Sequence, residues 1–219
     1  MTNTLFSFEK PSDNVVEIGN IQDIYGKNKQ YKIVQGLDFE KALIINDNWG
    51  RFTWNIFEKI RHAGYSNSEI YNMLSQINAE DLHWDWGGKS MVLNGSQYEW
   101  FYFHINGRPH GACVFHHPEK SELNTDDIFY VEYIAVAPWN RTHDFNKAEL
   151  KGVGTILLKC ALKYSLSHLN LGHGFSLHSL PQASGFYKNK GMIAIPNKEK
   201  DGLDYYELPR AIAEKWMEV

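Results

Sequence analysis

The sequence predicts a single α/β domain in which a mixed central sheet carries helices on both faces. Three observations lead to this prediction. Short β-branched and aromatic segments alternate with helical patterns along most of the chain. The length of 219 residues suits one domain, and a hydrophobic content of 43% is enough for a sizeable core. Asn106-Gly107 lies between two apolar segments and predicts a β-hairpin, because its turn needs positive φ.

The chain is expected to begin with a short extension. Residues 1–30 are polar and uneven apart from an apolar piece at 15–18, and we expect them to pack on the domain formed by residues 31–219. Alternating residues at 31–35 indicate the first strand.

Helices are predicted next. Apolar residues recur at three- and four-residue steps over 49–62, and Gly64 ends that helix. Ser66 and Glu69 have the spacing of a capping box, which opens a second helix to about Ile77. Residues 82–90 are predicted to form a loop because two glycines follow each other there.

The rest of the chain alternates between strands and helices. Period and turn signals predict strands over 98–105, 112–115 and 128–136, a helix over 152–169, a strand over 175–180, a short helix over 182–189, a strand over 205–208 and a last helix from Pro209.

Composition excludes several classes of function. A net charge of −4 argues against extended nucleic-acid binding, which needs clustered Lys and Arg. Two cysteines allow neither a disulfide framework nor a cysteine-rich metal site, and Cys160 falls on the apolar side of its helix. We expect no metal, because His116 and His117 point to opposite faces of a strand and no familiar ligand spacing includes His110. The absence of an apolar run or secretory signal indicates a soluble, cytoplasmic protein without membrane contact.

The sharpest local signal follows the strand over 128–136. A helix opens at Lys151-Gly-Val-Gly-Thr155, where glycines let backbone N–H groups approach an anion. The spacing matches neither a P-loop nor a Rossmann fingerprint. Residues 140–190 hold seven basic and two acidic side chains, a local charge of +5 that would favour a cofactor carrying phosphates.

Three segments together resemble the GNAT N-acetyltransferase superfamily, which moves an acyl group from acyl-coenzyme A to an amine. They read Val136-Ala-Pro138, Glu149-Leu-Lys-Gly-Val-Gly154 and Ala183-Ser-Gly-Phe-Tyr-Lys-Asn-Lys-Gly-Met192, in the family's order. The resemblance covers about residues 98–208 and implies a GNAT-like domain.

The sequence departs from the family pattern in three places. Glu149 stands where an Arg or Gln usually opens the glycine loop, and it would repel a diphosphate if it pointed inward. The segment between Arg141 and Glu149 is lengthened, and Leu180 or Pro181 occupies the place of a frequent Asn.

The resemblance implies that acetyl-coenzyme A, or another short acyl-coenzyme A, is the co-substrate. The backbone of Ile134 and Val136 would pair with its pantetheine arm. The residues expected around its phosphates are Arg141, Lys151, Gly152, Val153, Gly154 and Thr155. The expected acceptor is a primary amine of a small molecule or a peptide.

Catalytic roles also follow from the resemblance. Tyr187 would protonate the departing thiolate, or it is a packing residue beside Phe186. Tyr130 or Glu132 would receive the ammonium proton, since Tyr130, Glu132, Ile134 and Val136 are expected to share one strand face. Glu132 has two other interpretations, as a binder of the cationic acceptor and as part of a structural ion pair.

The acceptor pocket is expected at Trp84, Asp85 and Trp86, where a carboxylate lies between aromatic rings, although such residues also serve as loop anchors. Two other functions stay open. One is a non-catalytic GNAT-like regulatory module that binds coenzyme A or a protein. The other is acetylation of aminoacyl-tRNA, which the acidic net charge disfavours. Either a monomer or a homodimer is compatible with the sequence.

Overall fold

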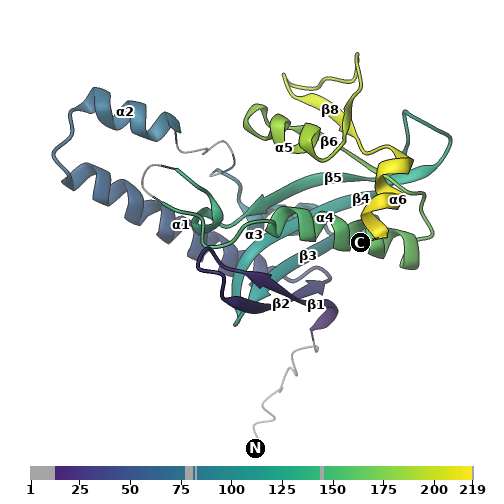
Figure 1. Ribbon diagram of the computed structural model, residues 1–219, viewed down its shortest axis with the longest axis horizontal. Helices are drawn as coiled ribbons and strands as arrows, with labels where there is room; N and C mark the ends of the chain where they lie inside the picture. Colours follow the sequence, from purple (N-terminus) through teal and green to yellow (C-terminus); the bar gives the residue numbers. More distant parts are fainter. Residues whose placement is uncertain (1–12, 77–80, 82, 144–145, 219) are drawn as a thin grey trace, which may run out of the picture.

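Aromatic and β-branched segments in the middle of the chain form the long strands of one mixed sheet. The computed structural model describes residues 13–76, 81, 83–143 and 146–218. Its strands are β1 (Asn14–Gln22), β2 (Asn28–Gln35), β3 (Tyr98–Ile105), β4 (Arg108–Lys120), β5 (Asp127–Val136), β6 (Phe175–Ser179), β7 (Ile193–Ala194) and β8 (Asp204–Glu207). They lie in the order β1-β2-β3-β4-β5-β6-β8-β7 (Figure 1). Only β5 and β6 pair in parallel among these neighbours.

Helices cover both faces of this sheet, as the sequence predicts. They are α1 (Phe39–His62), α2 (Asn67–Gln76), α3 (Trp86–Val92), α4 (Val153–His168), α5 (Ser184–Asn189) and α6 (Arg210–Met217), with short 3-10 helices η1 (Pro138–Asn140) and η2 (Pro181–Ala183). The predicted fold class is therefore confirmed. None of the helices in the described chain combines the length and the apolar character needed to cross a membrane.

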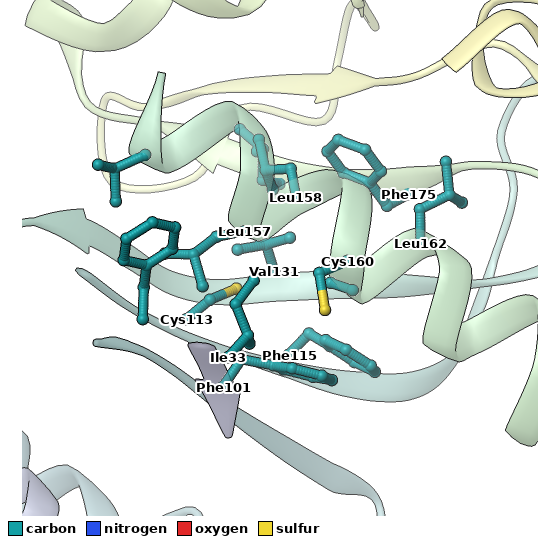
Figure 2. Close-up of a cluster of buried hydrophobic side chains, with 14 of the residues drawn as sticks. Ile33, Phe101, Cys113, Phe115, Val131, Leu157, Leu158, Cys160, Leu162 and Phe175 are labelled. Carbon is teal, nitrogen blue, oxygen red and sulfur yellow. The ribbon is translucent and has the colours of Figure 1, made fainter. Parts of the chain in front are cut away.

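Alternation along β3 separates two hydrophobic clusters. Phe101 and Phe103 pack in the larger one, against α4 and α6, whereas Trp100 and Tyr102 pack in the other, against α1 and α3. Figure 2 shows the larger cluster between α4 and the strands. Cys160 lies within it as a free, buried thiol, which agrees with the expected core position.

Two local expectations are met closely. Asn106 and Gly107 have φ values of 49° and 79° between β3 and β4, as the predicted turn requires. The Ser66 hydroxyl accepts from the Glu69 N–H at 3.4 Å, and the Glu69 carboxylate accepts from the Ser66 N–H at 2.8 Å. The predicted end of this helix at Ile77 lies outside the described residues.

The N-terminal third contains more regular structure than expected. Residues 14–22, placed in the predicted extension, form β1, and β2 begins at Asn28 rather than at residue 31. The hairpin that they make is the edge of the sheet. Helix α1 begins at Phe39, ten residues before the predicted start, because Asp38 accepts from the Lys41 N–H and caps it.

The predicted loop over 82–90 is wrong from Trp86 onward, where α3 begins. Asp85 caps α3 by accepting from the Gly88 N–H at 2.9 Å. A Cβ at Gly87 would lie 2.8 Å from Leu43, so this glycine allows α3 to approach α1 closely. The paired glycines serve a cap and a helix contact instead of a loop.

Candidate functional site

An opening beside β5 defines the candidate site. In the described chain β5 pairs with β6 only from Phe129 to Val131, and the two strands part beyond that point. The side of residues 132–136 away from β4 therefore has no partner strand among the described residues. Apart from the Val136 carbonyl, which accepts from Arg141, the backbone groups on that side can pair with a ligand.

One cavity, which we name the glycine-loop cavity, lies at this opening. Its volume is about 380 Å³, and it extends from Ile134 and Val136 on β5 to the first turn of α4 and to Phe186 on α5. Gly152 precedes α4 with φ of 93°, in the left-handed region that favours glycine. The first N–H groups of α4, on Val153, Gly154 and Thr155, have no acceptor within the helix and are suited to an anion. The structure thus brings the glycine-loop residues and the two β5 residues expected at the cofactor, Ile134 and Val136, to one cavity.

Asn140 is a residue of this cavity that the sequence did not single out. Its Nδ2 donates to the His110 carbonyl at 3.2 Å, so its Oδ1 is turned the other way. Asn140 is only 9% exposed, and this buried oxygen has no hydrogen-bond partner among the described residues. Since an unpaired buried acceptor is costly, Asn140 is a candidate for accepting a hydrogen bond from a ligand.

Arg141 and Glu149, in the loop before α4, each form an ion pair that the sequence did not predict. Arg141 makes two hydrogen bonds to Asp81, at 2.6 and 2.5 Å, and its Nη2 also donates to the Val136 carbonyl at 2.8 Å. Glu149 points away from the glycine-loop cavity and pairs with Arg108 at 2.9 Å, so it does not repel an anion there. Lys151 lines the cavity and makes no ion pair with a described residue.

A second cavity, the strand cavity, opens on the β6 side of β5. It measures about 340 Å³ and is lined by Tyr130, Glu132, His178 and residues near Leu203. His116 Nδ1 lies 2.8 Å from a Glu132 oxygen and Nε2 lies 3.1 Å from a Glu119 oxygen, so the protonated ring can donate to both carboxylates. These two carboxylates, Glu132 first, raise the pKa of His116 above its ordinary value despite partial burial.

Tyr130 belongs to the same group of side chains. Its ring stacks on His116, and its hydroxyl donates to His178 Nδ1 at 2.7 Å, because His178 Nε2 donates to the Lys198 carbonyl. Burial raises the pKa of Tyr130 to about 12, so its hydroxyl keeps its proton near neutrality. That state suits Tyr130 to positioning rather than to accepting a proton.

The predicted common face of β5 is wrong, because a β-bulge interrupts the alternation. Val114 pairs with Tyr133 and Phe115 with Val131, which leaves Glu132 as the extra residue. Tyr130 and Glu132 consequently lie on the His116 side of the sheet. Ile134 and Val136 pack instead on the α4 side, against the larger hydrophobic cluster.

Tyr187 lies where the two cavities meet. Both are lined by Tyr187 together with Ile134, Leu180 and Ala183. The ring packs in the larger hydrophobic cluster, and burial raises the pKa of its hydroxyl above the ordinary value. The hydroxyl therefore stays protonated near neutrality, at the place where the two cavities meet.

The third cavity, the tryptophan cavity, contains the predicted acceptor residues Trp84, Asp85 and Trp86. It has a volume of about 430 Å³ and lies between α1, Asp81, residues 83–86 and Pro138. Trp86 is buried against Trp49 and Trp84, whereas Asp85 caps α3 and accepts from Asn46 at 2.6 Å. Hydrogen bonds from the Gly88 backbone and Asn46 lower the pKa of Asp85. In the described residues no group of three or more His, Cys, Asp or Glu side chains is arranged to hold a metal ion.

No protein-family model and no curated protein matches the sequence. The structural neighbours are GNAT N-acetyltransferases at low sequence identity. RimJ of Mycobacterium smegmatis, in complex with CoA-disulfide, has a TM-score of 0.49 and 12% identity over 92% of this chain and 93% of its own. PseH of Campylobacter jejuni, in complex with acetyl coenzyme A, has a TM-score of 0.40 and 16% identity over 67% of this chain and 94% of its own.

An acyl-CoA N-acyltransferase from Pseudomonas aeruginosa has a TM-score of 0.42 and 13% identity, over 68% of this chain and 94% of its own. These neighbours belong to the family that the three sequence segments resemble. At such identities the similarity concerns the fold and does not extend to substrates.

Proposed function

We propose that this protein is an N-acyltransferase that moves an acetyl or other short acyl group from acyl-coenzyme A to a primary amine. One observation carries the proposal: two cavities of different character meet at Tyr187. The glycine-loop cavity has backbone donors suited to a phosphate-bearing cofactor, and the strand cavity has a carboxylate suited to an amine. A transfer between two substrates requires such a junction.

Several features of the glycine-loop cavity fit coenzyme A. The first N–H groups of α4 would receive the diphosphate, and Lys151 supplies a positive charge beside them. The free side of β5 near Ile134 and Val136 would pair with the amide groups of the pantetheine arm, and Asn140 Oδ1 is a further acceptor. Since Arg141 already holds Asp81 and the Val136 carbonyl, a phosphate contact by Arg141 remains a prediction.

The chemistry proposed at the junction is direct attack. The neutral amine nitrogen bonds to the thioester carbonyl carbon, and the carbon–sulfur bond then breaks. Glu132 receives the ammonium proton, directly or through water, and Tyr187 gives its proton to the leaving thiolate. His116 holds the Glu132 carboxylate toward the strand cavity. Tyr130 stays protonated and supports His116 and His178.

Calorimetry with acetyl-coenzyme A, followed by a thiol-release assay over a panel of amines, tests the proposal. We expect binding and acceptor-dependent release of thiol. Binding without release from any amine would favour the regulatory module, and no binding at millimolar concentration would reject a coenzyme A function altogether.

The Tyr187→Phe variant tests the proton donor. We expect kcat to fall about a hundredfold or more while acetyl-coenzyme A binds as before, because the ring still fills its place in the core. Tyr25→Phe, at an exposed turn, is the control. Full turnover by Tyr187→Phe would remove Tyr187 from the chemistry, and an unchanged pH–rate profile for Glu132→Gln would remove Glu132.

A further inference from the structure

The tryptophan cavity has features of a built binding site. Aromatic rings from α1 and from residues 84–86 surround it: Trp49, Trp54, Phe57, Trp84 and Trp86. Flat apolar walls of this kind favour a ring over a flexible polar chain, since rings stack in offset or edge-to-face geometry with little loss of conformational entropy.

A buried hydroxyl in the same cavity lacks a partner. Thr53 on α1 is 8% exposed and lines the cavity, and its Oγ1 has no hydrogen-bond partner among the described residues. Leaving such a group unpaired is costly. A ligand with a hydrogen-bonding substituent would satisfy it.

The carboxylates of this cavity are already engaged. Asp81 is held by Arg141, and Asp85 caps α3 and accepts from Asn46. A polyamine bound in the cavity would need carboxylates that are not already engaged to pair with its ammonium groups. The cavity therefore favours the uncharged part of a ligand.

A carboxylate for the ligand's amine lies in the adjoining strand cavity, which Glu132 lines. The Lys89 ammonium already occupies the faces of Tyr133 and Trp84, 3.4 Å and 5.5 Å from the ring centres, so Glu132 is the group in the strand cavity that suits an ammonium. Both Trp84 and His83 line the tryptophan cavity and the strand cavity, so the two spaces adjoin there. A ligand with its ring in the tryptophan cavity can therefore extend an amine past Trp84 toward Glu132.

We propose that the acceptor is a primary amine joined by a short chain to an aromatic ring that carries a hydrogen-bonding group, with the ring bound in the tryptophan cavity. The role of this amine as the acceptor rests on the proposed acyl transfer. The binding of the ring, however, depends only on the cavity and Thr53.

Equilibrium binding of three probes tests the ring site without turnover. Tyramine, phenethylamine and 1,5-diaminopentane are titrated by calorimetry into the full-length protein, with and without saturating coenzyme A. We expect tyramine to bind about three- to tenfold more tightly than phenethylamine, because it alone reaches Thr53 with a hydroxyl. Both aromatic amines should bind more tightly than the diamine.

Two variants locate the effect. Thr53→Val keeps the shape of the side chain and should remove the preference for tyramine over phenethylamine, while Thr125→Val in an exposed loop should preserve it. Trp54→Ala should weaken both aromatic amines several-fold and leave the diamine unchanged, because Trp54 is a 62% exposed wall of the cavity. Tyr25→Ala, which removes an 87% exposed ring elsewhere, is its control.

The outcomes separate this inference from the proposed function. Tighter binding of the diamine, or aromatic binding that neither Trp54→Ala nor Thr53→Val alters, overturns the ring site even if thiol is released with aliphatic amines. Aromatic binding that follows both variants, without thiol release from acetyl-coenzyme A, supports the ring site and rejects acyl transfer.

Discussion

Single polar atoms reveal more about the site than the charged residues do. Thr53 Oγ1 and Asn140 Oδ1 are buried at cavities and have no partner among the described residues. Neither is detectable in the sequence, because burial and the direction of a side chain depend on distant contacts. Arg141 shows the same limitation: its ion pair with Asp81 joins residues 60 positions apart, so a charge count over 140–190 omits the acid that neutralises it.

Thr53→Val should increase the stability of the protein. Replacing an unpaired buried hydroxyl with a methyl group removes a desolvation cost, and we expect the free energy of unfolding to rise by about 1 kcal/mol. Urea unfolding followed by tryptophan fluorescence measures this, with Thr125→Val expected to change little. A loss of stability in Thr53→Val would mean that the hydroxyl is satisfied in the native protein.

At the scale of elements, α4 and its leading glycines were predictable, and α3 was not. A glycine pair with apolar periodicity after it marks the start of α4 within one residue of the observed Val153. In residues 86–92 a glycine pair indicated a loop instead. That prediction was wrong because the helix is stabilised by the Asp85 cap and by the contact with Leu43, which the local sequence does not reveal. The local pattern therefore predicts a helix with a clear apolar periodicity, such as α4. It fails for a helix such as α3, which depends on a cap and on a contact with α1.

Gly152 and Gly154 should respond oppositely to alanine. Gly152→Ala forces a φ of 93° on an L-residue and should cost about 1–2 kcal/mol of stability. At Gly154 a Cβ would lie 3.7 Å from Val136 and 4.0 Å from Phe186, which is ordinary contact, so Gly154→Ala should gain up to about 1 kcal/mol from helix propensity.

The new Cβ at Gly154 would nonetheless enter the glycine-loop cavity, and acetyl-coenzyme A affinity should fall about tenfold or more. Thermal unfolding and calorimetry separate the two effects. Unchanged affinity in Gly154→Ala would contradict the assignment of this cavity to the cofactor.

At the scale of the whole molecule, buried histidines determine how the fold responds to acid. Burial first, and then the charge of Arg108, lower the pKa of His110 to about 4. Trp139 and Asn140 donate to its Nδ1, which must therefore be unprotonated in the native state. The unfolded chain takes up this proton near pH 6.5, so the folded state loses stability below that pH.

Stability should fall by up to about 3 kcal/mol between pH 6.5 and 4 because of His110, with no further loss from this group below pH 4. His110→Asn should flatten this dependence. His116→Asn should have the opposite effect: the raised pKa of His116 stabilises the fold below pH 6.5, and that contribution disappears as pH rises through the raised value. Unfolding free energies measured in urea at a series of pH values would show both. An identical slope for wild type and His110→Asn would contradict the burial argument.

Much of the architecture was predictable because the strands from β2 to β6 lie in chain order, so local elements suffice. A contact that was not predictable lies at the tip of the β1–β2 hairpin, where Ile24 donates to the Glu149 carbonyl and Asp23 forms a β-bridge with Leu150. No sequence pattern connects residues that lie so far apart in the chain.

The extra residue at Glu132 gives β5 two independent roles. An uninterrupted strand presents one set of alternate residues to each face along its whole length. The residues that line the strand cavity and those that line the glycine-loop cavity would then belong to the same alternate set. The bulge reverses this parity midway. Substitutions before Glu132 can reshape the strand cavity, while the residues after it keep their places along the glycine-loop cavity. Under the proposed function, the acceptor side of the site could therefore change without a change on the donor side.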